Sequence, residues 1–129
     1  MIVVDGSAII DALLAVPGSA ALRGFLSTEE LHAPSLIDYE VVSALRGLTL
    51  GGVITAARAQ DLLTDVDDLP LRRWPSSGGL RRRSFQLRDN VSAYDAAYLA
   101  LAEALGCALL TRDVRLGRSS GHNVPIDIL

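Results

Sequence analysis

The chain has 129 residues, of which half are hydrophobic, and a formal net charge of -3 at pH 7. This length suits one domain spanning residues 1–129. No run approaches the ~18 uncharged apolar residues of a membrane span. The acids within the opening MIVVDGSAIIDALL argue against a signal peptide. We therefore expect a cytoplasmic protein that contacts no membrane.

All 12 basic residues are arginine, and six of them lie between residues 72 and 88. The absence of lysine argues against a Walker-type phosphate loop, which needs a lysine on the phosphates. The net negative charge is unlike that of a protein that holds nucleic acid by bulk electrostatics. Any contact with nucleic acid should therefore come from a local cluster of arginines.

The first half of the chain alternates short apolar runs with helical patterns. IVVD (2–5) and LHAP (31–34) are predicted strands, and SAIIDALLA (7–15) and GSAALRGFLS (18–27) are predicted helices. Ser35 is expected to open a third helix, with Asp38 at a capping-box spacing, that runs to Gly47 or to the glycine pair 51–52. A fourth helix is predicted over 55–66.

The second half continues the alternation. PLRRW (70–74) suits an edge strand because it is flanked by prolines, and SSGG (76–79) is expected to be a loop. Helices are predicted over 80–89 and 92–105, and Gly106 is expected to close the second in a left-handed conformation. CALLT (107–111) should be a buried strand in which Cys107 acts as a small hydrophobe. VPIDIL (124–129) is the last predicted strand.

Five short strands separated by helices, with continuous apolar runs in the first and fourth, are typical of a parallel sheet covered on both faces. The predicted fold is a three-layer α/β/α sandwich. In such sheets, sites form beyond the carboxyl ends of strands, where the strand order reverses. Asp5 and Asp113 each stand where a predicted buried strand ends.

Each acid that could form a site also has an ordinary explanation. Asp95 lies three residues after Ser92 and could complete a capping box, Asp5 could cap the helix that follows it, and Asp113 could be a turn residue. Glu40 is harder to explain in this way. It borders the apolar stripe of its predicted helix and has no oppositely charged residue at i+3 or i+4.

If the four carboxylates converge, their charges need compensation. Two unit charges about 5 Å apart repel by roughly 3 kcal/mol at an effective dielectric of about 20. Either some carboxyl groups stay protonated or cations lie among them. Oxygen ligands without a nearby histidine or thiol suit Mg²⁺ or Mn²⁺, and such clusters cut phosphodiesters in many nucleases. The spacing alone leaves a capping role for these acids open.

Several segments together resemble the PIN-domain family, in particular the VapC-type ribonuclease toxins of bacterial toxin-antitoxin systems. The segments are IVVDGSAII, SLIDYEVVSALRGL, LRDNVSAYDAAYLALAEALGCALLTRD and VPIDIL. The resemblance implies an α/β/α sandwich with a five-stranded parallel sheet and RNA cleavage with Mg²⁺ or Mn²⁺. It also implies a homodimer and a cognate VapB-like antitoxin.

Carried onto this chain, the resemblance assigns the catalytic acids to Asp5, Glu40, Asp95 and Asp113. Asp5, Asp95 and Asp113 are expected to ligate the metal, and Glu40 to position a water molecule. Ser7 and Thr111 lie two residues from Asp5 and Asp113, close enough for their hydroxyls to hold a carboxylate or a water molecule. Ser7 could equally cap a helix.

The arginines of RRRSFQLRD are candidate RNA contacts, because arginine is a common donor to phosphate oxygens. Arg81, Arg82 and Arg83 are the residues that we expect to bind RNA, although a run of three on a helix is also typical of a solvated face.

Two other classes of function compete with the nuclease. The chain could be a non-catalytic PIN-fold protein-binding module whose acids serve only as helix caps. It could also be a phosphatase with Asp5 as a covalent nucleophile, since DGS follows a strand. The missing lysine makes the phosphatase less attractive, because such sites commonly use a lysine to steady the phosphoryl group.

Overall fold

The computed structural model describes residues 1–129, and all five strands form one parallel sheet in the order β3-β2-β1-β4-β5. The strands are β1 (Ile2–Val4), β2 (Leu31–Pro34), β3 (Leu71–Trp74), β4 (Leu109–Thr111) and β5 (Ile126–Ile128). The helices are α1 (Gly6–Leu13), α2 (Ala20–Thr28), α3 (Ile37–Leu50), α4 (Ala56–Asp68), α5 (Gly78–Gln86), α6 (Ala93–Leu105) and α7 (Val114–Gly117).

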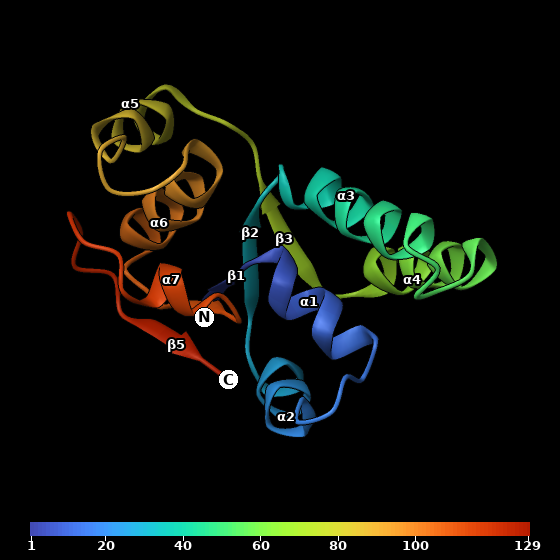
Figure 1. Cartoon of the computed structure of the whole chain (residues 1–129). Helices are drawn as coiled ribbons and strands as arrows, with labels where there is room; N and C mark the ends of the chain where they lie inside the picture. Colours follow the sequence, from blue (N-terminus) through green and yellow to red (C-terminus); the bar gives the residue numbers. More distant parts are fainter.

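Helices cover both faces of the sheet, as Figure 1 shows. On one face α6 packs against β1 and β2, and α5 packs on the side of α6 that faces away from the sheet. On the other face α1, α3 and α4 pack against one another, with α2 beside α1. The predicted α/β/α sandwich is confirmed. The longest helix, α3, has 14 residues, and no helix combines the length and apolar character of a membrane span.

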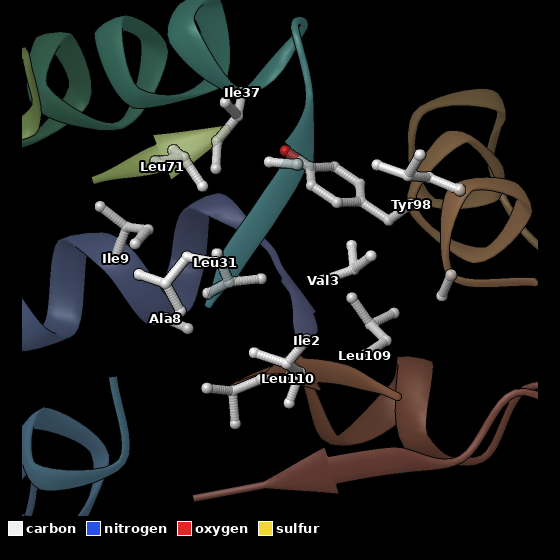
Figure 2. Close-up of a cluster of buried hydrophobic side chains, with 14 of the residues drawn as sticks. Ile2, Val3, Ala8, Ile9, Leu31, Ile37, Leu71, Tyr98, Leu109 and Leu110 are labelled. Atoms are coloured by element: carbon white, nitrogen blue, oxygen red, sulfur yellow. The ribbon is translucent and has the colours of Figure 1, made fainter. Parts of the chain in front are cut away.

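The core lies on both sides of the central strands (Figure 2). Every residue of β1, β2 and β4 is buried, which explains the apolar sequences of β1 (IVV) and of the start of β4 (LL); His32 of β2 and Thr111 of β4 are buried polar residues. Leu109 and Leu110 of β4 and Val3 of β1 are fully buried. Because β1 and β4 are parallel neighbours in this core, their carboxyl ends lie side by side.

The structure corrects the predicted start of α3. Ser35 does not cap this helix, which begins at Ile37 without a side-chain cap. The backbone N–H of Ser35 donates instead to the carbonyl oxygen of Trp74 at 2.8 Å, so Ser35 continues the pairing between β2 and β3. Asp38 accepts a hydrogen bond from Arg73 Nε at 2.7 Å and takes no part in a capping box.

Other corrections concern short segments. SSGG is not a loop throughout, because Ser77 caps α5 through the N–H of Leu80 and the helix begins at Gly78. Strand β4 begins at Leu109, two residues later than predicted, so Cys107 is only partly buried and the prediction of a buried cysteine is wrong. The short helix α7 was not predicted. Gly106 does end α6 in the left-handed conformation, with a φ of 66°.

Candidate active site

The candidate site lies at the carboxyl edge of the sheet, between β1 and β4. Strands β2 and β3 lie on one side of β1 in the sheet, and β4 and β5 lie on its other side, so the strand order reverses between β1 and β4. Asp5 follows β1, and its backbone N–H donates to the carbonyl oxygen of Leu110 at 3.2 Å. Asp5 therefore stands beside Thr111, the last residue of β4.

Three hydrogen bonds hold the Asp5 carboxylate. Its Oδ1 accepts from Ser7 Oγ at 2.7 Å and from the N–H of Ala8 at 3.1 Å, which makes Asp5 the N-cap of α1. Its Oδ2 accepts from Thr111 Oγ1 at 2.5 Å. Burial raises the pKa of Asp5, although all three hydrogen bonds act to lower it. The Ser7 hydroxyl thus supports the carboxylate and does not cap the helix itself.

Glu40 reaches the same place from the first turn of α3. A Cβ atom placed on Gly6 would lie 3.5 Å from Glu40 Oε2, so the carboxylate packs directly on the residue after Asp5. Burial, followed by the charges of Asp5 and Asp95, raises the pKa of Glu40 to about 7. Negative charges from three separate elements therefore act on one another at this edge of the sheet.

Asp95 comes from the first turn of α6. Its backbone N–H donates to Ser92 Oγ at 3.2 Å, but its carboxylate makes no return bond, so only half of the predicted capping box forms. Asp95 and Asp113 line one hollow of about 440 Å³. The charge of Asp95 also raises the pKa of Asp5 and of Glu40. Its carboxylate thus lies near the other two acids.

Asp113 is joined to Asp5 through Thr111. The N–H of Asp113 donates to Thr111 Oγ1 at 2.9 Å, while the same hydroxyl donates to Asp5. The Asp113 carboxylate accepts from the N–H of Arg115 at 2.9 Å as the cap of α7, and it lies 3.6 Å from the Arg115 guanidinium. Asp113 therefore serves as a cap and also borders the hollow that Asp95 lines.

The oxygen ligands available at this site suit a hard divalent cation. The groups that face the site are carboxylates and hydroxyls. Burial, and after it the charges of neighbouring acids, raises the pKa of Asp5 and of Glu40, and a cation would stabilise their ionised forms. The acids do not form a finished cage, since no three histidine, cysteine, aspartate or glutamate side chains are placed to hold a metal ion as they stand. Binding would therefore require side-chain adjustment or water molecules between some acids and the ion.

Residues 2–121 match the PIN domain family. The chain belongs to this family. Over its full length it is 39% identical to Ribonuclease VapC12 and 42% identical to Ribonuclease VapC9, both from Mycobacterium tuberculosis strain H37Rv. It covers 99% of the first relative and 98% of the second.

Among solved structures, this PIN domain resembles VapBC2 from Rickettsia felis, which was crystallised with a DNA fragment from its promoter. The TM-score is 0.72 at 15% identity, and the match covers 99% of this chain and 98% of the other. At that identity the likeness concerns the fold, which agrees with the sheet and helix layers described above.

The three arginines proposed to contact RNA are separated on α5 of this PIN domain. Arg83 is engaged by Glu103 of α6, with its Nε 3.0 and 3.1 Å from the two carboxylate oxygens. Arg81 donates to Ser76 Oγ at 2.5 Å, and Arg82 is exposed. Arg81 and Arg82 are therefore freer than Arg83 to meet a ligand.

One residue of the site was not anticipated. Tyr98 of α6 is 1% exposed, and its hydroxyl is buried with no hydrogen-bond partner. It lies three residues after Asp95, so both side chains project from the same side of the helix. Burial and the charges of Glu40, Asp5 and Asp95 raise the pKa of Tyr98. The i, i+3 spacing from Asp95 was the available sequence signal.

Proposed function

We propose that this PIN domain is a Mg²⁺-dependent endoribonuclease toxin of the VapC type, held inactive by a cognate antitoxin. One observation carries the proposal: Asp5, Glu40 and Asp95 come from three different elements, yet their charges act on one another at the reversal point of the sheet. The names of its relatives, ribonucleases VapC12 and VapC9, agree with this activity.

The site residues have different proposed roles in hydrolysis. Asp5, oriented by Ser7 and Thr111, would be the most firmly held oxygen ligand of a cation, and Asp95 and Asp113, which line one hollow, would supply further oxygens. When bound, the cation would lower the pKa of a water molecule and screen the charge of the phosphodiester. Glu40 orients the attacking water through its carboxylate. Mn²⁺ should substitute for Mg²⁺ because it accepts the same oxygen ligands.

An antitoxin partner is supported by the similarity of the fold to that of VapBC2 from Rickettsia felis. An antitoxin arginine that entered the acid cluster could satisfy the carboxylates in place of a cation. We also propose that the toxin forms a homodimer, as the family resemblance implies.

RNA cleavage should require a divalent cation. We expect the purified protein to cut single-stranded RNA with Mg²⁺ or Mn²⁺ and to lose activity to background in EDTA, because the acids then repel one another and no cation screens the phosphate. Gel analysis of a labelled RNA, with excess Mg²⁺ added back to the EDTA sample, measures this. Cleavage that persists undiminished in EDTA would overturn the proposed mechanism.

The arginines of α5 are proposed to guide RNA into the site. Arg81 lines a groove of about 580 Å³ that also contains Arg88 and no acidic residue. Ser92 borders both this groove and the hollow that holds Asp95. A strand whose phosphates meet Arg81 would therefore lie next to the acids.

Replacing Arg81, Arg82 and Arg83 by alanine should weaken RNA binding and flatten its salt dependence. Each lost phosphate contact lowers the slope of log K against log salt by about 0.7 for a single strand. Because Glu103 engages Arg83, the Arg81→Ala/Arg82→Ala pair should account for most of the change. Titration of an uncleavable RNA at several salt concentrations measures the slope. Arg58→Ala, an exposed arginine of α4, is the control, and an unchanged slope in the triple variant would exclude this surface.

Asp5 and Asp113 each cap a helix, as the hypothesis of a non-catalytic binding module predicts for the acids. Capping does not account for Glu40 or for the Asp95 carboxylate, neither of which caps a helix. An aspartyl-phosphate mechanism fits less well still, because the chain has no lysine to steady the phosphoryl group.

A further inference from the structure

The buried hydroxyl of Tyr98 is the one side-chain polar atom in the core that lacks a hydrogen-bond partner. Buried polar groups are nearly always paired, since an unpaired one loses its hydration without compensation. Tyr98 otherwise fills the space between α6 and the sheet as a phenylalanine would. Figure 2 shows its ring extending from α6 toward β2 and the start of α3, with the hydroxyl oxygen at the far end.

The acceptor that faces this hydroxyl is Glu40. Among the charged groups that raise the pKa of Tyr98, Glu40 has the largest effect, ahead of Asp5 and Asp95. Tyr98 in turn is the one hydroxyl close enough to lower the pKa of Glu40, although the two groups do not reach hydrogen-bonding geometry. The two groups therefore lie close together without a hydrogen bond.

The remaining acids are poorer candidates. Both oxygens of Asp5 are already engaged by Ser7, Ala8 and Thr111. Asp95 has the weakest charge effect on Tyr98 of the three acids. Glu40, in contrast, is half-buried and has no other hydroxyl beside it. Two neighbouring groups, one donor and one acceptor, are thus left unpaired and face each other.

We propose that Tyr98 is a positioning residue for Glu40: its hydroxyl donates to the Glu40 carboxylate when a divalent cation is bound among the acids, and so sets where that carboxylate stands. The inference rests on the proposed function, because it assigns Glu40 the orientation of the attacking water. It implies that the hydroxyl contributes little to the fold of the metal-free protein. The hydroxyl should contribute to stability only when a divalent cation is bound at the site.

Tyr98→Phe tests this, with Tyr94→Phe as the matched control. Tyr94 lies one turn earlier on α6 and is 71% exposed, so its hydroxyl faces water. In metal-free buffer Tyr98→Phe should melt no lower than the unsubstituted protein, because it removes an unpaired group. The rise in melting temperature caused by Mg²⁺ should be smaller in Tyr98→Phe. With RNA, kcat should fall on the order of 10-fold with KM unchanged, as expected for a lost bond to a charged group.

A second variant separates positioning from packing. In a Glu40→Ala background, which has no acceptor at this position, the further change Tyr98→Phe should leave the Mg²⁺-induced melting shift unaltered if the hydroxyl acts through Glu40. An effect of the same size in both backgrounds would overturn the proposal. A lower melting temperature of metal-free Tyr98→Phe, with the Mg²⁺ shift and kcat unchanged, would overturn it too.

The change in melting temperature on adding Mg²⁺ tests the role of Tyr98 independently of RNA cleavage. An unsubstituted protein that gains stability from Mg²⁺ but cleaves no RNA would refute the nuclease, and the shift in Tyr98→Phe would still decide the role of the hydroxyl. An unsubstituted protein with no response to Mg²⁺ would overturn the role of Tyr98.

Discussion

Asp95→Asn should reduce RNA cleavage by at least about 100-fold, because it removes one negative charge that would stabilise the cation and the transition state. The fold should survive. The backbone N–H of residue 95 still donates to Ser92, and the carboxylate makes no capping bond that would be lost. Loss of a favourable charge at the helix N-terminus costs about 0.3–1 kcal/mol, and relief of repulsion with Asp5 and Glu40 offsets it.

This substitution also separates the nuclease from a non-catalytic binding module. Cleavage rates with Mg²⁺ and the free energy of unfolding in urea should be measured on the same preparations. Asp65→Asn, an exposed aspartate on α4, is the control for the chemical change itself. Retention of most cleavage activity by Asp95→Asn would show that this acid is only part of a helix end, as the module hypothesis holds.

The elements that could be predicted from sequence are those whose signals are local. Strands β1 and β4 follow from their apolar runs, and the bounds of α6 follow from Ser92 and Gly106, whose capping chemistry depends only on adjacent residues. The start of α3 was misplaced because Ser35 is held by Trp74 of another strand. A capping-box spacing cannot reveal that the backbone N–H is already engaged at the sheet edge.

The site shows the same division between local and distant contacts. Asp5 and Asp113 were found because each stands where an apolar strand ends, and parallel strands present those ends at one edge. Tyr98 was missed because its significance depends on Glu40 of another helix. The engagement of Arg83 by Glu103 joins α5 to α6 and likewise has no sequence signature.

Thr111→Val should destabilise the protein by about 2–4 kcal/mol and also lower its activity. The Thr111 hydroxyl is fully buried and joins two site acids, since it donates to Asp5 and accepts from the N–H of Asp113. Valine has nearly the same shape but leaves Asp5 Oδ2 and the N–H of Asp113 without this partner, and an unpaired buried polar group costs about 1–3 kcal/mol. Urea unfolding in metal-free buffer measures the loss, and Thr111→Ser, which keeps the hydroxyl, should lose only about 1 kcal/mol.

The pH dependence of this loss identifies the group responsible. Burial raises the pKa of folded Asp5 above its unfolded value of 3.8, so ionised Asp5 favours unfolding, and stability is lost as pH rises through the folded pKa. The Thr111 hydrogen bond opposes that shift. Its removal raises the pKa further, so Thr111→Val should be more destabilising at pH 8 than at pH 5. An equal loss at both pH values, or a larger loss in Thr111→Ser, would show that packing of the side chain matters more than its bond to Asp5.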